Sequence, residues 1–299
     1  MICHQYPIAV MSFNRPDYLE AVLKTLVGQV DADLDQRPVA LFQDGCVNPF
    51  SAQRRAREED VIRCEKLFRE YIPSGSVHSS PDNLGIALNF ERAEEHVFEE
   101  LDAEAAIFLE DDLILSPYYI NSLDHLIAVA LKDERIGHVA VYGHHRTALS
   151  EQMRSPDAYV LLEHNWAFGL TRRQWLRNRE YVTPYLEIVR NCDYQTRDTG
   201  AIHKLYTSWG MGCPGDSQDV TKTIACCLTG AVKLNTKACL GKYIGARGIH
   251  MKQEWYDRLG YANTELYPCS ITKFKELSED CYEQILKVQM RWATEKPCR

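Results

Sequence analysis

The sequence predicts an α/β fold with a doubly wound, mostly parallel central sheet flanked by helices. Strand and helix patterns alternate about five times over roughly the first 140 residues, which is typical of parallel sheets. The 299 residues are 45% hydrophobic and 25% charged, so the chain can bury one large core. No linker, repeat or low-complexity segment interrupts it. We therefore expect one domain over residues 1–299, with a regular half (1–142) and a less regular half (143–299).

The first predicted elements alternate clearly. Residues 6–13 are apolar and β-prone, and this strand ends at Asn14-Arg15-Pro16. Pro16 begins a helix, because apolar residues recur at helical spacing as far as Val27, and Gly28 ends the pattern. Residues 38–42 form a second short strand, which Gln43-Asp44-Gly45 closes.

The next elements repeat the alternation. A charged helix is expected over 51–71, a brief strand at 77–78 and a helix over 83–101. Residues 105–109 form a buried strand that runs directly into Glu110-Asp111-Asp112. A helix over 117–131 and a strand over 138–142 complete the regular half.

The charge of the chain limits its partners. The formal net charge is −8, from 34 basic and 42 acidic residues, and no long basic run exists. This excludes nucleic acid as an expected partner. An acidic protein that binds an anionic nucleotide must neutralise it locally, and a divalent cation can do so.

Cysteine spacing and apolar runs predict the compartment. The 11 cysteines show no CxxC pair and no zinc-ligand spacing, which is typical of reduced thiols. Residues 1–7 lack the features of a signal peptide, and no apolar run approaches the roughly 20 residues of a membrane helix. We therefore expect a cytoplasmic protein with no transmembrane segment.

The acidic triplet Glu110-Asp111-Asp112 follows a strongly apolar strand. Ligands of open α/β sheets bind outside the carboxyl ends of strands. Adjacent carboxylates repel one another, and their hard oxygen atoms suit Mg²⁺ or Mn²⁺. A solvated acidic turn that caps the next helix is the alternative. The apolar residues at 105–109 and 113–115 favour the metal site.

The segment Phe108-Leu-Glu-Asp-Asp-Leu-Ile-Leu-Ser-Pro117 resembles the metal-binding, DxD-type segment of glycosyltransferases with the Rossmann-like GT-A fold. It is most similar to the inverting N-acetylglucosaminyltransferase I type. The resemblance implies a UDP-sugar donor and Mn²⁺ or Mg²⁺ as cofactor. It implies that Asp112 coordinates the metal and that Glu110 and Asp111 hold the donor. Residues 1–142 would then bind the nucleotide, and residues 143–299 the acceptor.

Three further segments resemble the same family in the same order. Pro7 to Pro16 resembles the opening strand and loop that cradle the nucleotide, here with Ser12, Asn14 and Arg15. Arg15 could pair with a phosphate near a helix N-terminus. Leu41-Phe-Gln-Asp-Gly45 resembles the strand end whose aspartate, here Asp44, accepts the uracil imide proton. Asn83-Leu-Gly-Ile-Ala87 resembles the loop before the metal strand. Ordinary turns are the alternative.

The second half carries a looser resemblance. His164 to Trp175 resembles a segment of bacterial GT-A enzymes that faces the donor sugar and the acceptor. Trp166 could stack on a sugar or belong to the core, and the same alternatives apply to Phe168. Tyr243 to Met251 resembles the closing loop of the family, where Arg247 would neutralise the pyrophosphate. The resemblance makes His250 a second metal ligand, and a purely structural histidine is the alternative.

An inverting transfer needs a general base on the acceptor hydroxyl. In the family this is an acidic residue in the first turn of a helix downstream of the tryptophan segment. Asp216 and Asp219 are the candidates, and we favour Asp219 because an apolar helical pattern starts directly after it. We expect Asp216 at the N-cap and Asp219 at N3, and two capping carboxylates are the alternative reading.

The resemblance as a whole implies a metal-dependent inverting glycosyltransferase, either a hexosyltransferase or an N-acetylhexosaminyltransferase. Its acceptor would be a carbohydrate, a lipid-linked or a small-molecule hydroxyl, as in bacterial polysaccharide or glycoconjugate synthesis. Two other functions stay open. A sugar-nucleotide nucleotidyltransferase usually has a Gly-x-Gly-x-Arg loop where this chain has Ser-Phe-Asn-Arg15. A non-catalytic sugar-nucleotide-binding protein would not need the intact acidic triplet.

Overall fold

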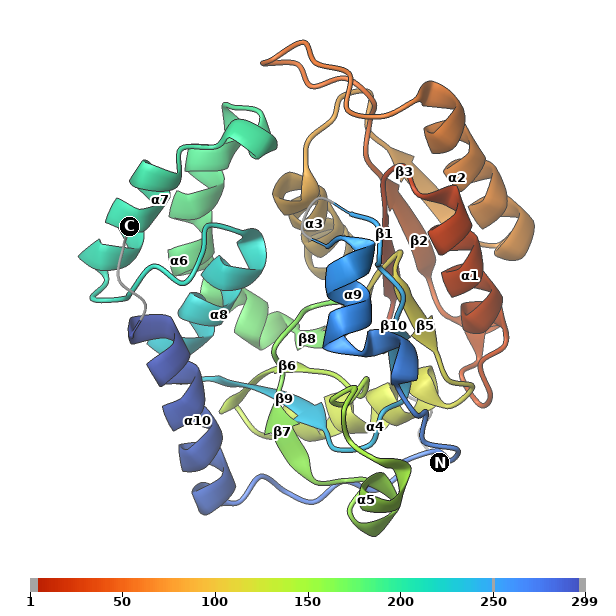
Figure 1. Ribbon diagram of the computed structural model, residues 1–299, viewed down its shortest axis with the longest axis vertical. Helices are drawn as coiled ribbons and strands as arrows, with labels where there is room; N and C mark the ends of the chain where they lie inside the picture. The colour runs from red at the N-terminus through yellow and green to blue at the C-terminus, as the bar shows by residue number, and fades with distance from the viewer. Residues whose placement is uncertain (1–4, 249–250, 296–299) are drawn as a thin grey trace.

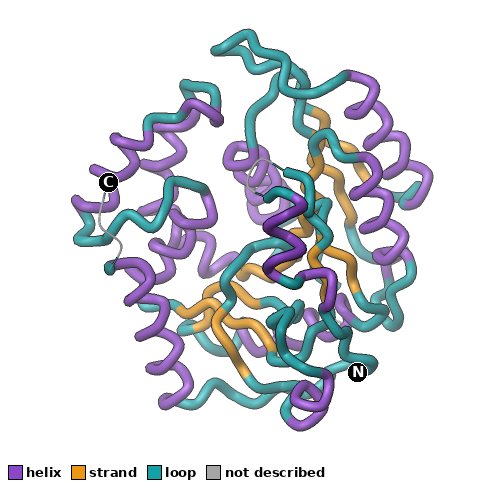
Figure 2. Tube along the Cα trace, viewed as in Figure 1, coloured by secondary structure: helices purple, strands orange, loops and turns teal. Residues whose placement is uncertain are grey.

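The computed structural model describes residues 5–248 and 251–295. Within these residues the main sheet has eight strands in the order β3-β2-β1-β4-β8-β6-β9-β7, and helices flank it (Figures 1 and 2). The strands are β1 (Ile8–Ser12), β2 (Val39–Gln43), β3 (Ser76–Ser79), β4 (Ala105–Glu110), β6 (Ile136–Val139), β7 (Tyr159–Leu161), β8 (Ala167–Thr171) and β9 (Val232–Thr236). Within this main sheet, four of the described strand pairings are parallel and three are antiparallel. The predicted α/β class, with a mostly parallel sheet between helices, is confirmed.

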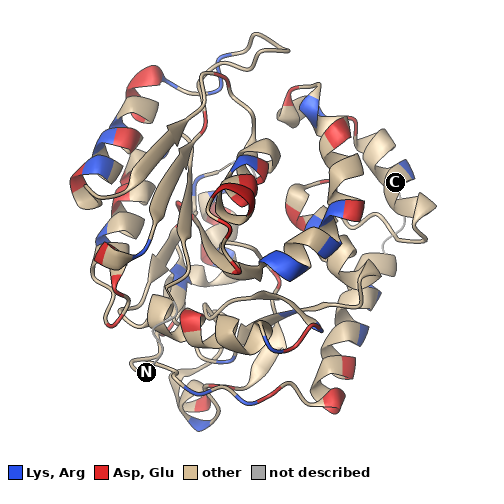
Figure 3. Cartoon of the chain, turned by 180° about the vertical axis from the view of Figure 1, so that it is seen from behind, with Lys and Arg blue, Asp and Glu red and all other residues tan. Residues whose placement is uncertain are grey.

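The helices that accompany the sheet come from both halves of the chain. They are α1 (Pro16–Val27), α2 (Glu58–Tyr71), α3 (Ile86–Glu95), α4 (Tyr119–Ala130), α5 (Leu149–Arg154), α6 (Arg172–Arg190), α7 (Thr199–Ser208), α8 (Gln218–Leu228), α9 (Gln253–Leu259) and α10 (Glu279–Thr294). Seen from behind, α3, which carries several acidic residues, lies beside α6, which carries several basic ones (Figure 3). The ion pair between Glu91 and Arg190 joins these two helices.

The parallel part of the sheet is built from the regular first half. β1 lies between β2 and β4, and all three strands run parallel. Every residue of β1 and β2 is buried. This follows from helices on both faces, with α1 and α2 on one side and α3 on the other (Figure 1). The carboxyl ends of the three strands therefore meet at one edge.

Two predicted helix boundaries are wrong. The helix predicted over 51–71 begins only at Glu58, because the preceding residues form a turn. There the Asn48 side chain accepts hydrogen bonds from the backbone N–H groups of Phe50 and Ser51. The helix predicted over 83–101 begins at Ile86 and ends in a π-helical turn, His96–Glu100.

A small second sheet was not predicted from the sequence. Residues 113–115 form β5 (Leu113–Leu115), which pairs antiparallel with β10 (Gly241–Tyr243). Just beyond this pairing, Ile244 N–H donates to the carbonyl of Asp112 at 2.8 Å. The pairing thus brings the loop after β10 onto the acidic triplet.

The antiparallel strand β8 links the two halves. It lies between β4 and β6 and runs opposite to both. Its amino end therefore lies at the edge where β4 ends, and the N–H of Glu110 donates to the carbonyl of Trp166 at 2.7 Å. Residues of both halves share one large apolar core.

Within the described residues, no helix is both long and apolar enough to cross a bilayer. Eight cysteines of this part of the chain are free thiols, among them Cys64, Cys226 and Cys239 in the interior. Cys213 takes part in a disulfide.

Candidate active site

Five segments meet at the carboxyl edge of the parallel strands. They are the ends of β1, β2 and β4, the residues before β8, and the first turn of α8. Glu110 is the last residue of β4, and the side chains of Asp111 and Asp112 lie in the turn before β5. Both aspartates are only 4% exposed. The end of β4 and the turn after it thus place three carboxylates close together at the carboxyl edge of the sheet.

Arg15 faces this acidic turn from the loop after β1. Its guanidinium forms an ion pair with Asp111, and its Nη1 lies 2.9 Å from Asp112 Oδ2. Burial lowers the pKa of Arg15, but the charges of Asp111 and Asp112 outweigh this and raise it. Its guanidinium also lies 5.3 Å from the centre of the Tyr18 ring. Arg15, which we predicted to contact the nucleotide, is therefore the cation that balances the acidic turn.

Arg15 does not neutralise the triplet completely. Burial, and then the charges of Asp112 and Asp219, hold the pKa of Glu110 well above its usual value. Burial also raises the pKa of Asp112 to about 6, against the opposing influence of Arg15. Such raised values mean that negative charge is disfavoured here, so an added cation would bind where it relieves the repulsion.

The residues present fit a divalent metal ion at Asp112. Its Oδ1 atom is buried without a hydrogen-bond partner among the described residues. The backbone of Gly245 approaches the same carboxylate closely, since a Cβ at that position would lie 2.3 Å from the Tyr243 hydroxyl oxygen and 2.7 Å from Asp112 Oδ2. Carboxylate oxygens are the ligands that Mn²⁺ and Mg²⁺ prefer.

A protein-only metal cage is nevertheless absent from the described part of the chain. No group of three or more His, Cys, Asp or Glu side chains there is arranged to hold a metal. His250, the second ligand implied by the resemblance, lies outside the described residues. A metal at Asp112 would therefore complete its shell with water and ligand phosphates, as Mg²⁺ commonly does.

The two candidate bases lie in different surroundings. Asp219 Oδ1 accepts hydrogen bonds from Asn165 Nδ2 at 3.0 Å and from Gln218, and its charge acts on Glu110. Asp216 instead forms an ion pair with Arg197 and accepts from Thr199 Oγ1 at 2.6 Å. Only Asp219 faces the acidic triplet.

The predicted capping of this helix is wrong. Ser217 is the N-cap of α8, and its side chain accepts from the N–H of Val220. Asp216 precedes the cap, and Asp219 stands at N2 and not at N3. Serine caps a helix as well as aspartate does, which leaves the Asp219 carboxylate free to point away from the helix end.

Asp44 lies at the end of β2 and is buried. Its carboxylate accepts four hydrogen bonds, from the N–H groups of Gly45, Leu84 and Gly85 and from Asn83 Nδ2. Burial raises its pKa to about 6, although these backbone donors oppose the shift. A carboxylate has about four acceptor positions, so those needed for a uracil contact are already used in this conformation. Here Asp44 anchors the loop at 83–85.

The other predicted nucleotide contacts lie around the start of α1. Ser12 is buried at the end of β1, and Asn14 is partly exposed in the loop that follows. Arg247 pairs with Asp17, and its guanidinium lies 5.1 Å from the Tyr18 ring centre. It is thus near the N-terminus of α1 and not in contact with the triplet. Arg15 and Arg247 flank the same tyrosine, which concentrates positive charge beside a helix N-terminus.

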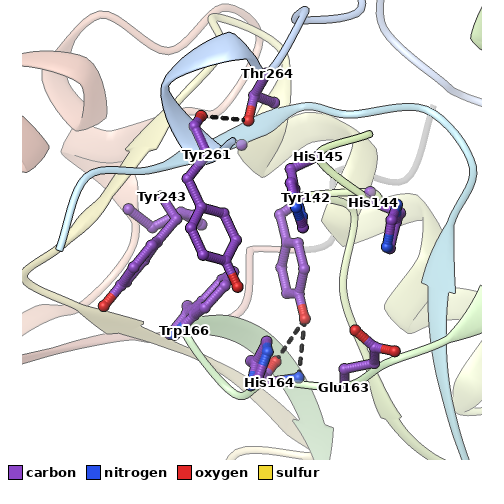
Figure 4. A pocket seen from close by; sticks show the side chains of 12 residues that line it. Tyr142, His144, His145, Glu163, His164, Trp166, Tyr243, Tyr261 and Thr264 are labelled. Atoms are coloured by element: carbon purple, nitrogen blue, oxygen red, sulfur yellow. Dashed lines mark hydrogen bonds between the residues drawn. The ribbon is translucent and has the colours of Figure 1, made fainter. Parts of the chain in front are cut away.

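Trp166 belongs to an aromatic cluster beside the triplet (Figure 4). Its ring stacks on Tyr243, with ring centres 4.1 Å apart, and on His164 at 4.4 Å, and it lies between them. Both faces of the indole are therefore occupied. Phe168 is fully buried against Phe108. Neither ring offers a free face to a sugar in this conformation.

The aromatic cluster borders a small hollow of about 20 Å³, room for about one water molecule. Tyr142, Trp166, Tyr243 and Tyr261 form its apolar wall, and the exposed Glu163 lies at its rim. The charges of Asp112 and Glu110 act on the Tyr243 hydroxyl, so the hollow adjoins the acidic turn. This hollow could not be predicted from the sequence, because its walls come from four separate segments.

No protein-family profile matches the chain, and no curated protein sequence matches it. Several solved structures are similar to it. TarS from S. aureus (residues 1–349, with UDP-GlcNAc) shows 13% identity and a TM-score of 0.47, covering 97% of this chain and 67% of TarS. A mannosyltransferase from Pyrobaculum calidifontis, in complex with GDP-Man and Mn²⁺, shows 14% identity and a TM-score of 0.39, covering 68% of this chain. This chain spans about half, 52%, of that enzyme. At such low identities and TM-scores, neither activity nor substrate follows from the likeness.

Proposed function

We propose that the protein is a metal-dependent, inverting glycosyltransferase of the GT-A type, which moves a sugar from a UDP-sugar to an acceptor hydroxyl. The observation that carries this proposal is the position of Asp219, whose carboxylate is held by Asn165 at the entry to β8 and acts electrostatically on Glu110. Glu110 lies two residues before Asp112, whose Oδ1 atom has no described partner. A carboxylate opposite a cation site is what an inverting displacement requires. In this proposal residues 1–142 hold the nucleotide and residues 143–299 the acceptor.

The chain's own residues have separate tasks in this mechanism. Asp112 would hold Mn²⁺ or Mg²⁺, which neutralises charge on the diphosphate as it leaves. Arg15 lies between Asp112 and the start of α1, where it can exchange a carboxylate for a phosphate oxygen. Asp219 takes the proton of the acceptor hydroxyl. At the same time the oxygen of that hydroxyl attacks the anomeric carbon of the donor sugar, and the bond between this carbon and the diphosphate breaks.

We place the acceptor over the aromatic residues around Trp166 in the second half of the chain, because the hollow there is too small in this conformation to enclose a sugar ring. The hollow adjoins the acidic turn through Tyr243, and His164 at its rim lies within the influence of the Asp219 charge. An acceptor lying there would have its hydroxyl near Asp219. Aromatic walls with a polar rim suit a carbohydrate, either free or as part of a glycoconjugate.

The test is release of nucleoside diphosphate from a panel of UDP- and GDP-sugars, with Mn²⁺ and with EDTA. We expect the protein to turn over a UDP-sugar. EDTA should abolish this turnover, and the Asp112→Asn variant should show none. Asp219→Asn should lower kcat by about 10²- to 10⁴-fold, the range of general base catalysis, with little change in KM for the donor.

Asp216→Asn is the matched control, because it changes the neighbouring carboxylate, which is already paired with Arg197. It should keep a near-normal kcat. The proposed mechanism is overturned if turnover is insensitive to EDTA, or if Asp219→Asn stays active while Asp216→Asn does not.

A further inference from the structure

We propose that Lys233 and Asn165 are positioning residues for Asp219: Asn165 orients its carboxylate, and Lys233 is a buried, unpaired cation that stabilises its negative charge. This inference rests on the proposed role of Asp219 as the base. It concerns a polar network behind the sheet edge that no other part of the mechanism uses.

Asn165 makes the direct contact. It immediately precedes Trp166 at the entry to β8 and is fully buried. Its Nδ2 donates to Asp219 Oδ1 at 3.0 Å. A buried amide that donates to a carboxylate fixes the direction of its free oxygen, which is the atom that must accept a proton.

Lys233 lies behind Asp219 on β9 and is 0% exposed. Its Nζ donates to Thr223 Oγ1 at 2.9 Å, and that hydroxyl donates to the backbone carbonyl of Asp219 at 2.8 Å. Lys233 forms no ion pair with any carboxylate in the described ranges. It is thus connected to Asp219 through one hydroxyl group and through space.

A neighbouring lysine shows how unusual this is. Lys222 on α8 is also buried, but its ammonium group pairs with Glu94 and lies 4.5 Å from the Phe90 ring centre. A buried charge normally has such a partner, because removal from water is expensive. Lys233 has only the more distant Asp219.

The electrostatic surroundings agree with this arrangement. Burial lowers the pKa of Lys233, and the negative charge of Asp219 is the first influence that opposes the shift. Lys222, and the neutral thiols of Cys226 and Cys227 on α8, also face Lys233, and on β6 its register partner is the neutral His138. Asp219 itself is faced by Glu110 on β4 and by His164 as well as by Lys233. The charge of Asp219 also acts on the Tyr194 hydroxyl. Of these four groups, Lys233 is the lysine.

An unpaired buried lysine lowers the stability of the fold, so replacing it with an apolar side chain of similar shape should not harm the fold. If Lys233 acts on Asp219, however, the same replacement should slow the reaction. A purely structural role predicts that stability and activity fall together. The two roles therefore give opposite results for one variant.

The first experiment measures thermal unfolding and kcat of Lys233→Met. We expect an unchanged or higher unfolding midpoint and a kcat lower by about 10- to 100-fold, as for other residues that support a catalytic side chain. Lys222→Met is the matched control and should lower the midpoint, because it leaves Glu94 buried without its partner. An unchanged kcat for Lys233→Met, or a lower midpoint, overturns the proposal.

A second experiment does not depend on catalysis. Asp219→Asn should lower the unfolding midpoint of the natural chain, since it removes the charge that balances Lys233, but should have little effect in the Lys233→Met background. Additive effects of the two substitutions would overturn the proposal even if the enzyme is active. If coupling is present but no sugar nucleotide is turned over, the electrostatic pairing stands and the proposed transferase function is what fails.

Discussion

Buried ionisable side chains that lack a full set of partners gather around the candidate site. Asp112 keeps an unpartnered oxygen, and Lys233 lacks a described ion-pair partner. The ring of His138 interacts with the Asn165 side chain. Away from the site, Arg37 forms an ion pair with Asp124, although its Nε has no partner among the described residues. Incomplete partnering at single residues destabilises a fold, and at a candidate site it leaves groups available to ligands and reacting atoms.

His138 gives a prediction at this scale. It is fully buried, and its ring stacks on Phe168 with ring centres 5.1 Å apart. Burial, and then the charges of Lys233 and Lys222, hold the pKa of His138 well below 6.5. The folded chain therefore keeps it neutral where the unfolded chain protonates it. Stability linked to His138 is present above the unfolded pKa and is lost as the pH falls below it.

His138→Phe removes this linkage and keeps a flat ring against Phe168. As the pH falls below 6.5, the free energy of unfolding of the variant should rise relative to that of the natural chain by up to about 1.4 kcal/mol per pH unit. Urea unfolding at pH 7.5, 6.5 and 5.5 measures the difference. A difference that is constant across this range, or that shrinks toward acid pH, would contradict the assignment.

At the level of elements, the sequence predicted what depends on local patterns. β1, α1, β2 and β4 lie close to their predicted positions, because each has an apolar period, a turn or cap signal, and little competition. β5 was missed, because a three-residue strand exists only through β10, which comes more than one hundred residues later. Tertiary pairing decides such a strand, and propensity does not.

The candidate site, like the fold, was predictable only where it depends on local sequence patterns. The triplet and Arg15 follow predicted strands, so their meeting at one edge could be expected. The contact between Asn165 and Asp219 could not, since it depends on β8 running antiparallel, which no local pattern in the sequence revealed. Lys233 was missed for the same reason: a lysine in a strand reads as an exposed residue until its neighbours are known.

The loop after β10 gives a prediction at the element scale, through two glycines that differ only in surroundings. A Cβ on Gly245 would lie 2.3 Å from the Tyr243 hydroxyl oxygen and 2.7 Å from Asp112 Oδ2, whereas one on Gly248 would meet no described atom nearer than Arg15 Nη1 at 3.6 Å. Gly245→Ala should therefore displace the loop from the acidic turn and weaken Mn²⁺-dependent nucleotide binding by at least tenfold. Gly248→Ala should bind nearly as the natural chain does.

Calorimetric titration of UDP with Mn²⁺ separates these two variants. Unfolding midpoints measured without ligand show whether the alanine at 245 disturbs the fold as a whole or only the loop. Equal affinities in the two variants would mean that the close approach of Gly245 to Asp112 has no part in binding.

For the whole molecule, metal and nucleotide should act together on stability. Arg15 already balances Asp111 and Asp112, so Mn²⁺ alone must compete with a buried guanidinium. A diphosphate changes this, because it offers Arg15 new acceptors and gives the metal further oxygen ligands. We therefore expect neither ligand alone to raise the unfolding midpoint much, and both together to raise it clearly.

The size of this effect follows from mass action. With both ligands at a hundredfold excess over Kd, the folded state should gain about 2.7 kcal/mol, which thermal unfolding detects as a shift of several degrees. EDTA should reverse the shift, and Asp112→Asn should abolish it while leaving the midpoint without ligand unchanged or higher, since it removes a buried carboxylate with a raised pKa. A full shift with UDP alone would show that Arg15 and the start of α1 bind the diphosphate without a metal, and the metal would then have no place in donor binding.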